Sequence, residues 1–429
     1  MLKKKVLGAV LSLSWALGLA LSSAAYAGPL DGNASDVMLQ GFHWRSTETS
    51  PWWGVIQGKA ADIKSSGFSM VWLPPSQDAA SNEGYLPRQL YVQNSKYGTD
   101  VQLKSAIGSL HTSGVKAIAD IVVNHRVGTT SWGDFTNPTW GTWSVARGDE
   151  WTSATGNPDT GDGYGAARDL DHTNGTVQTD LKAWMNWLKS SIGYDGWRYD
   201  YVKGYGGTYV GNYNTGTVPY FSVGELWTDL DLANPDAHRQ LLMNWIDSTG
   251  STANAKSAAF DFTTKGLLQQ AAQYGEYWRL KDSAGKPAGA IGWWAAKSVT
   301  FVDNHDTGPS YPSGGQNHWP FPNGNQEVMQ GYAYILTHPG VPCVYWVHFY
   351  DWDQATYGSK IKLLMAARKE KGVTSTSAVS IQAAQTNLYA AIITGNTGSL
   401  AVKLGTTSWS PGTGWTLVTS GINWAVWKK

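Results

Sequence analysis

Eight short apolar runs recur along the chain, and each has the length and composition of a buried β-strand. Longer stretches with helical periodicity separate several of them. The predicted strands cover residues 37–44, 68–74, 116–124, 196–202, 221–227, 258–262, 299–302 and 341–346. The predicted helices include residues 58–66, 101–113, 177–192 and 326–336. This alternation predicts a parallel sheet covered by helices, and eight such units predict a (β/α)8 barrel of the α/β class.

Polar residues of types that support catalysis stand where the predicted strands end. They are Asn124, His125, Asp200, Glu225, His305 and Asp306. In a (β/α)8 barrel the carboxyl ends of all strands meet at one face, and functional groups gather there. The sequence therefore predicts an active site at that face.

Two segments do not follow the alternation. The first, residues 125–165, is rich in Gly, Thr, Asp and Trp and is too long for an ordinary barrel loop. The second follows a helix-like stretch at residues 360–371 and shows alternating apolar residues, with predicted strands at 388–393, 400–404 and 415–418. We expect a catalytic barrel of residues 28–124 and 166–372, an inserted loop-rich domain of residues 125–165, and a C-terminal antiparallel β domain of residues 373–429.

The first 27 residues have the pattern of a signal peptide. Lys3, Lys4 and Lys5 precede an apolar run over residues 6–21, and Ala25-Tyr26-Ala27 gives a small-x-small cleavage pattern. We expect a signal peptide over residues 1–27 and secretion, either extracellular or periplasmic. No later run of about 18 apolar residues predicts a membrane span, so we expect no membrane association after cleavage.

Charge and composition narrow the function classes. Lysine plus arginine total 32 and aspartate plus glutamate total 32, which disfavours binding to nucleic acid or to an anionic membrane. The chain is only 15% charged but has 24 Trp and 21 Tyr, whose flat rings suit the faces of sugars. Cys343, the single cysteine, lies in an apolar run, and we expect a buried free thiol. We expect the protein to act as a monomer.

Two carboxylates end neighbouring predicted strands. Asp200 and Glu225 therefore project from backbones about 4.8 Å apart, and retaining glycosidases need about 5–5.5 Å between their carboxyls. This favours double displacement, with Asp200 as nucleophile and Glu225 as acid/base. Arg198 would keep Asp200 ionised, while the apolar neighbours Leu226 and Trp227 would raise the pKa of Glu225.

Four further polar residues belong to this prediction. Asp306 would be a third carboxylate, able to hold sugar hydroxyls and favour ring distortion. His125 and His305 are donors placed to bind the same ring. Asp120 lies deeper in its predicted strand, and we interpret it as a buried partner of Arg198 and not as a catalyst.

Four motifs carry a family resemblance. They are D-I-V-V-N-H at 120–125, G-W-R-Y-D-Y-V-K at 196–203, G-E-L-W at 224–227 and F-V-D-N-H-D at 301–306. In this order and spacing they resemble the α-amylase family of glycoside hydrolases. The segments E-G-Y-L-P at 83–87, G-N-P-D-T-G at 156–161 and G-W-W-A-A-K at 292–297 look similar to plant-type and related bacterial members.

The resemblance implies a set of site residues. Catalysis would fall to Asp200, Glu225 and Asp306, and substrate contacts to Tyr85, His125, Arg198, Lys203 and His305. A structural Ca²⁺ would bind Asn124, Asp149, Asp159 and the backbone carbonyl of Gly204, a set of oxygen donors that suits this ion. Trp293 and Trp294 would form either a surface glucan-binding platform or a hydrophobic patch on the barrel.

The implied activity is endo-hydrolysis of internal α-1,4-glucosidic bonds in starch and maltooligosaccharides. An exo-acting maltooligosaccharide-forming amylase and a transglycosidase would keep the same motifs, so both alternatives stay open. A noncatalytic glucan-binding relative would have lost a carboxylate, whereas all three are present here.

Overall fold

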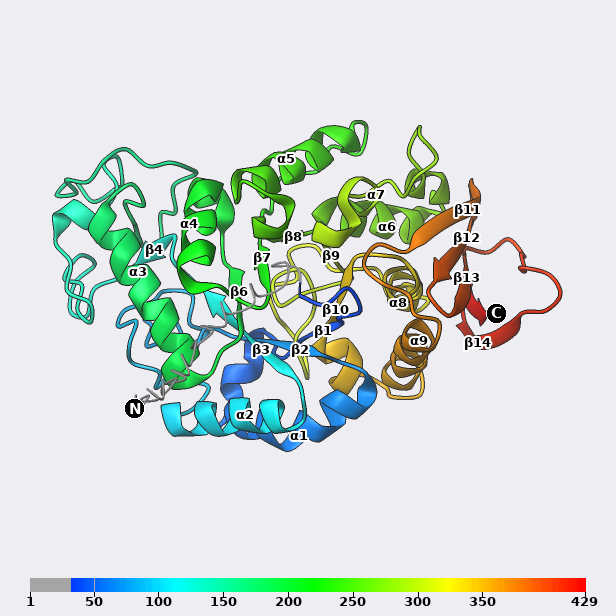
Figure 1. The fold of residues 1–429 in the computed structure, drawn as a ribbon, viewed down its shortest axis with the longest axis horizontal. Helices are drawn as coiled ribbons and strands as arrows, with labels where there is room; N and C mark the ends of the chain where they lie inside the picture. Colours follow the sequence, from blue (N-terminus) through cyan, green and yellow to red (C-terminus); the bar gives the residue numbers. More distant parts are fainter. Residues whose placement is uncertain (1–31, 50) are drawn as a thin grey trace, which may run out of the picture.

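Eight parallel strands close into a barrel in the order β1-β10-β9-β8-β7-β6-β3-β2 (Figure 1). They are β1 (Met38–Gln40), β2 (Met70–Leu73), β3 (Lys116–Ile121), β6 (Gly196–Tyr199), β7 (Ser222–Gly224), β8 (Ala258–Phe260), β9 (Ser298–Phe301) and β10 (Val341–Tyr345). Each strand overlaps one of the eight predicted runs, so the barrel prediction is confirmed. The computed structural model describes residues 32–49 and 51–429, and the predicted signal peptide lies outside these residues.

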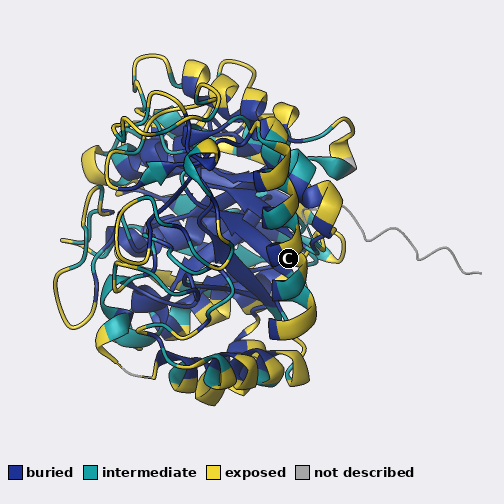
Figure 2. Cartoon of the chain, turned by 90° about the vertical axis from the view of Figure 1, so that its left-hand side faces the viewer, coloured by how far each residue is buried: buried dark blue, intermediate teal, exposed yellow. Residues whose placement is uncertain are grey.

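Helices surround this barrel, and their outer faces carry most of the exposed residues while the strands are buried (Figure 2). They are α1 (Trp52–Ser66), α2 (Asp100–Thr112), α3 (Gly175–Trp187), α4 (Gly207–Thr217), α5 (Pro235–Ser248), α6 (Phe262–Tyr274), α7 (Ile291–Trp294), α8 (Glu327–Thr337) and α9 (Gly358–Glu370). Local sequence fixes several ends. Thr99 and Gln102 form a capping box at the start of α2, and Gly67 ends α1 in the left-handed region at φ 112°. Among the described residues, no helix is long and apolar enough to cross a membrane.

The chain between β3 and β6 leaves the barrel and returns to it. Its entry and exit pair as a short antiparallel ribbon, in which β4 (His125–Arg126) lies beside β5 (Arg168–Asp169). Turns, loops and a short 3-10 helix (Thr142–Ser144) fill the interval. In Figure 1 these loops lie at one side of the barrel, beyond α3 and α4. The boundaries of an inserted domain stay a prediction.

The C-terminal segment forms a five-stranded antiparallel sheet at the opposite side of the barrel (Figure 1). Its strands are β11 (Ala378–Gln385), β12 (Leu388–Gly395), β13 (Gly398–Leu404), β14 (Thr416–Gly421) and β15 (Trp424–Lys428), in the order β11-β12-β13-β15-β14. His338, which follows α8, bonds to Tyr389 Oη at 2.8 Å and so links barrel and sheet. The predicted C-terminal antiparallel fold is confirmed.

Candidate active site

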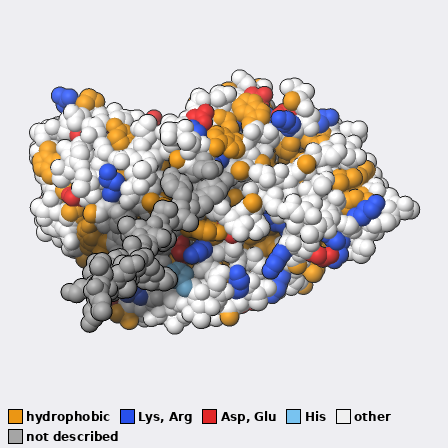
Figure 3. All heavy atoms as spheres, viewed as in Figure 1, with side chains coloured by type: hydrophobic (Ala, Val, Ile, Leu, Met, Phe, Trp, Pro, Cys, Tyr) orange, Lys and Arg blue, Asp and Glu red, His pale blue; other side chains and the backbone are white. Residues whose placement is uncertain are grey.

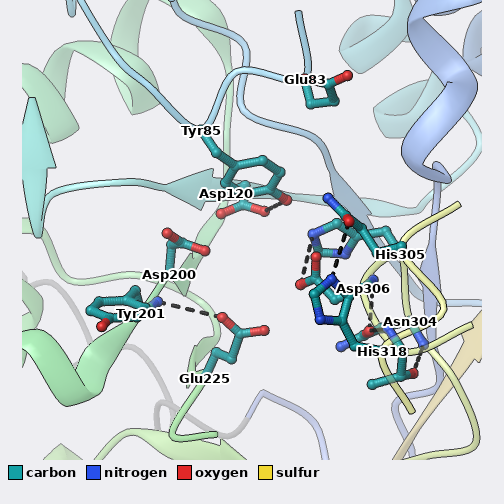
Figure 4. Close-up of polar contacts among 12 residues, drawn as sticks. Glu83, Tyr85, Asp120, Asp200, Tyr201, Glu225, Asn304, His305, Asp306 and His318 are labelled. Carbon is teal, nitrogen blue, oxygen red and sulfur yellow. Dashed lines mark hydrogen bonds and ion pairs between the residues drawn. The ribbon is translucent and has the colours of Figure 1, made fainter. Parts of the chain in front are cut away.

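Asp200 and Glu225 follow directly after neighbouring strands of the barrel. The Asp200 amide donates to the Ile121 carbonyl at 3.0 Å, and the Glu225 amide donates to the Tyr199 carbonyl at 3.0 Å. The strand hydrogen bonding therefore continues through both residues and fixes their main chains. Figure 4 shows Asp200 and Glu225 on one side of a common space and Asp306 on the other.

One guanidinium contacts three carboxylates at this point. Arg198 Nη1 donates to Asp200 Oδ1 at 2.6 Å and to Asp120 Oδ1 at 2.8 Å. Its Nη2 lies 2.8 Å from Glu225 Oε1, an ion pair without hydrogen-bond alignment. Arg198 is fully buried, and its guanidinium lies 4.8 Å from the centre of the Trp72 ring. The predicted contacts of Arg198 with Asp200 and Asp120 are both present.

Burial and neighbouring negative charges raise the pKa of three carboxyl groups in the site. Burial raises the pKa of Glu225, with a further rise from Asp200 that Arg198 opposes. Burial and then the charge of Glu225 raise the pKa of Asp306 well above its usual range. Burial also raises the pKa of Asp120 to about 7. Because the site holds more carboxyls than cations, it favours keeping some of them protonated near neutral pH.

His305 joins Asp306 to the barrel interior. Its Nδ1 lies 2.9 Å from the Gln40 amide nitrogen, which places the amide as donor, and its Nε2 lies 3.3 Å from Asp306 Oδ2. Burial lowers the pKa of His305 well below its usual range, so the ring is neutral. Asp306 itself is oriented by its backbone amide, which donates to Asn304 Oδ1 at 3.0 Å.

An aromatic wall lies beside these groups. The Tyr85 ring is parallel to the Trp44 ring at 6.0 Å and to the His305 ring at 5.2 Å. The Tyr85 hydroxyl donates to Asp120 Oδ2 at 2.9 Å, which fixes the ring. Sequence reasoning missed Trp44: it ends the first predicted strand, the position at which polar site residues end other strands, but it belongs to none of the quoted motifs.

His125 is held by other parts of the protein. Its Nε2 donates to the Tyr85 carbonyl at 2.8 Å, and its ring stacks on Tyr164 at 3.9 Å. In this arrangement His125 supports the Tyr85 loop, and a direct contact between His125 and substrate stays a prediction. Lys203 lies with its Nζ 5.1 Å from the centre of the Tyr201 ring.

The cleft next to Glu225 continues along the surface. A cavity of about 400 Å³ is lined by Asp162, Tyr201, Lys203, Glu225, Trp227, Thr228 and Asp229. A second, of about 460 Å³, shares Trp227, Thr228 and Asp229 with it and adds Leu230, Leu232, Gln270, His318 and Trp319. Trp227 stacks on Phe262 at 5.5 Å, so its ring is fixed between core and cleft. Two adjoining cavities with shared walls offer room for several linked sugar units.

The predicted metal-binding residues are partly brought together. The loop at Gly161 packs closely on the turn at Gly204. A side-chain Cβ at position 161 would lie only 2.3 Å from the Gly204 carbonyl carbon. A Cβ at position 204 would lie 2.0 Å from Asn124 Oδ1, so only glycine lets this amide oxygen approach the turn. Burial raises the pKa of the nearby Asp159 carboxyl, and the charge of Asp149 adds to the rise.

Asp149 is already engaged by protein groups. Its Oδ1 accepts from Arg168 Nη1 at 3.1 Å and from the Trp151 amide at 2.6 Å, and its Oδ2 accepts from the Asp169 amide at 3.0 Å. Asp169 is a further carboxylate that sequence reasoning missed, although it follows the 125–165 insertion by only a few residues. Its Oδ1 accepts from Asn124 Nδ2 at 3.0 Å, and burial raises its pKa to about 7.

A metal site is not evident from carboxylates and imidazoles alone. Within residues 32–49 and 51–429, no three or more His, Cys, Asp or Glu side chains are grouped as metal ligands. The predicted set does not depend on such a group, because only Asp149 and Asp159 supply carboxylates. Its other donors are an amide oxygen and a main-chain carbonyl, which suit a hard cation.

Trp293 and Trp294 differ in exposure. The Trp293 side chain is 41% exposed, with the buried Arg239 guanidinium 3.9 Å from the centre of its ring. Trp294 is half-buried and packs against the core. Trp293 is therefore the more accessible of the two rings, and a surface glucan-binding platform stays a prediction.

Comparison with known proteins gives matches over nearly the whole chain. Residues 45–140 match "Alpha amylase, catalytic domain" and residues 370–428 match "Alpha-amylase C-terminal beta-sheet domain". The chain is 44% identical to "Probable alpha-amylase 2" of Arabidopsis thaliana, over 92% of this chain and 94% of that protein. It is 32% identical to "Glucan 1,4-alpha-maltotetraohydrolase" of Stutzerimonas stutzeri, over 88% of this chain and 69% of that protein.

A solved structure agrees with the architecture. The α-amylase of Geobacillus thermoleovorans, solved in complex with acarbose, superimposes with a TM-score of 0.67 at 17% identity, over 93% of this chain and 98% of that one. At this identity the likeness concerns the fold alone.

Proposed function

Because this chain belongs to the α-amylase family of glycoside hydrolases, we propose that it is a retaining endo-hydrolase of internal α-1,4-glucosidic bonds in starch and maltooligosaccharides. The observation that carries the proposal is the contact of one buried guanidinium with both carboxylates. Arg198 reaches Asp200 through Nη1 and Glu225 through Nη2, at 2.6 and 2.8 Å. The gathering of two carboxyls on one guanidinium supports double displacement, which needs about 5–5.5 Å between them.

The two carboxylates would act in sequence. Asp200 attacks the anomeric carbon while the bond to the leaving glucan oxygen breaks, and Glu225 transfers its proton to that oxygen. In the second half, ionised Glu225 takes a proton from water, whose oxygen attacks the anomeric carbon and releases Asp200. Burial raises the pKa of Glu225, which supports its role as the acid, and the hydrogen bond from Arg198 holds the Asp200 carboxylate in place.

The remaining residues would bind the sugar. The fixed Tyr85 ring would stack on the sugar at the cleavage point, and Asp306 with His305 would hold its hydroxyls. Lys203 lines the cavity next to Glu225 and would contact the leaving part of the chain. His125 would contribute through its hold on Tyr85 and, after a shift of its ring, through direct contact.

A Ca²⁺ ion would join the inserted loops to the barrel. Asn124 follows β3, Gly204 follows β6, and Asp159 lies in the insertion, so an ion held by all three would connect these parts. Asp149 would reach it only while also paired with Arg168. The ion would supply positive charge to a set of buried carboxylates and would not take part in the chemistry.

The endo mode rests on the resemblance of the segments at 83–87 and 156–161 to plant-type members. The two adjoining cavities next to Glu225 suit a leaving chain of several sugar units. The maltotetraohydrolase relative keeps the exo-acting alternative in view, and a transglycosidase would use the same carboxylates. We also propose that residues 1–27 direct secretion and that the mature enzyme is a monomer.

One time course tests the proposal. Soluble starch is digested with the mature enzyme while iodine colour, reducing ends and product anomeric form are recorded together. Rapid colour loss with few new ends and α-anomeric products is the expected result. One dominant oligosaccharide from the earliest points would replace the endo assignment with the exo one, and β-anomeric products would overturn the retaining mechanism.

A further inference from the structure

A third cavity lies beyond the two in the cleft. It has a volume of about 500 Å³, within the range of about 300–1,000 Å³ that is usual for ligand pockets. Its walls come from the start of α5, from α6, from the 3-10 helix η6 (Tyr277–Leu280) and from the turn that follows. Among the residues that line it are Leu232, Asp236, Leu267, Trp278, Arg279 and Asp282.

This third cavity is next to the second. Leu232 lines both, and helix α6 contributes to both through Gln270 on one side and Leu267, almost one turn earlier, on the other. The three cavities therefore form a series from Glu225 outward, with shared walls first at Trp227 and then at Leu232.

Arg279 gives the third cavity a fixed geometry. Its Nη1 donates to the Leu232 carbonyl at 2.9 Å, its Nε donates to Glu276 Oε2 at 2.6 Å, and its guanidinium lies 4.3 Å from the centre of the Trp278 ring. The same side chain thus holds the junction between the cavities and supports the indole. Trp278 nevertheless stays 47% exposed, a large apolar surface that packing does not use.

The chemistry of the lining points to a neutral polyhydroxylated ligand. Asp236 and Asp282 supply two carboxylates and Arg279 and Lys281 two cations, so the cavity selects neither anions nor cations by net charge. Charged side chains beside a half-exposed indole match sugar hydroxyls beside a flat sugar face. Over the surface where Figure 1 has α5 and α7, hydrophobic side chains lie among acidic and basic ones (Figure 3).

We propose that the cavity at Trp278 is a distal subsite for the leaving-group portion of a long α-glucan chain, reached from Glu225 across Leu232. The proposal rests on the proposed function, since it takes α-1,4-glucan as the ligand and Glu225 as the proton donor to the leaving chain. It assigns to Trp278 a role in selecting long substrates over short ones.

The test compares chain lengths. Values of kcat/KM are measured for the wild type and for Trp278→Ala on soluble amylose and on a chromogenic maltotrioside too short to reach the subsite. We expect a roughly 5- to 20-fold loss on amylose, as for one sugar–indole contact of about 1–2 kcal/mol, and no change on the trioside. Trp278→Phe, which keeps a flat ring, should restore most of the loss.

Two further variants make the result specific. Leu232→Trp fills the junction and should reproduce the chain-length effect while leaving Trp278 in place. Trp143→Ala, at an exposed ring of the insertion that lines none of the three cavities, is the matched control and should not change the amylose-to-trioside ratio.

Each alternative outcome overturns the subsite. Equal loss on both substrates would mean that Trp278 supports the fold, and no loss on either would mean that chains do not reach it. Loss of adsorption to granules without loss on soluble amylose would make it a separate surface site. Inactivity of the wild type on the trioside and on amylose alike would refute the proposed function instead.

Discussion

The barrel centre and the inserted loops both place carboxylates around one arginine, yet they are built differently. At the centre, Arg198 contacts Asp120, Asp200 and Glu225, and strand hydrogen bonding fixes the main chain of the last two. In the insertion, Arg168 contacts Asp149 and Glu150, and the acids are held mainly by amides of turns.

The two regions differ in the source of the positive charge that compensates their carboxylates. Every acid around Arg198 has that cation at 2.8 Å or less. In the insertion, burial together with Asp159 and Asp149 raises the pKa of Asp169 to about 7, and no cation is among the causes of its shift. The acids at the centre share a cation supplied by the protein, whereas we expect an added ion to serve the carboxylates of the insertion.

The largest effect expected is on turnover. Asp200→Asn should lower kcat by at least roughly 10⁴-fold, because the variant cannot form the covalent intermediate. The melting temperature should fall little, since Arg198 keeps Asp120 and Glu225. Activity and thermal unfolding are measured together, with the exposed Asp247→Asn as the same chemical change elsewhere. Retained turnover would remove Asp200 from the nucleophile role.

The acid role of Glu225 has its own signature. Activity needs Glu225 protonated, so kcat/KM should fall as pH rises through its pKa, which burial places above the usual carboxyl range. Glu225→Gln should lose about 10²- to 10⁴-fold on starch. The fluoride leaving group of maltosyl fluoride needs no proton. The residual kcat/KM of Glu225→Gln on this substrate should therefore not fall at alkaline pH. If the alkaline fall in kcat/KM of the wild type persists in Glu225→Gln, the titrating group is a residue other than Glu225.

The two arginines can be compared directly. Arg198→Met leaves three buried carboxylates without their cation and should destabilise the fold by about 3–5 kcal/mol. Arg168→Met should cost less when calcium is present, because an ion can replace the lost charge. Urea unfolding of both variants, with and without calcium, checks this. If both variants lose the same free energy of unfolding in the presence of calcium, the proposed difference between the two regions is wrong.

Removal of calcium should affect the insertion. A chelator should lower the melting temperature, because an ion held only by the folded state adds about 2.7 kcal/mol at 100 times its Kd. Asp159→Asn should abolish most of this dependence, whereas Asp247→Asn should preserve it. A melting curve that ignores free calcium in the wild type would count against the ion.

The smallest effect concerns the surface ring. Trp293→Ala should weaken adsorption to starch granules by a few-fold, about 1 kcal/mol, and leave cleavage of soluble starch unchanged. The half-buried Trp294→Ala should instead lower stability. If Trp293→Ala lowers adsorption and activity on soluble starch equally, the ring acts in the cleft or the core and not at a separate surface site.

The sequence was most informative where a residue's role follows from strand order. The eight strands, the contacts of Arg198 with Asp120 and Asp200, and buried Cys343 were predictable because apolar periodicity marks each strand and the carboxyl ends share one face. Strand lengths were overestimated, since the polar residues after each strand were counted within it.

Other features depend on contacts that no local pattern encodes. Strands β11 and β15 were not predicted. None of the residues of β11 is buried, so its apolar alternation is weak. Asp169 and Trp44 act through partners distant in sequence, Asn124 and Tyr85, which only the folded chain brings close. The engagement of Asp149 by Arg168 was equally invisible, because it depends on the path of the insertion.

Cys343 lies at the seam of the barrel, where β10 pairs with β1 and Cys343 stands opposite Met38. It is the chain's single cysteine, and burial raises the pKa of its thiol, so the folded protein hides it from alkylating reagents. Its labelling rate therefore reports how often β10 separates from its neighbours, β1 on one side and β9 on the other. Cys343 is therefore a natural reporter of barrel opening. The effect of calcium or glucan on its labelling rate would show whether ligands bound elsewhere slow the separation of these strands.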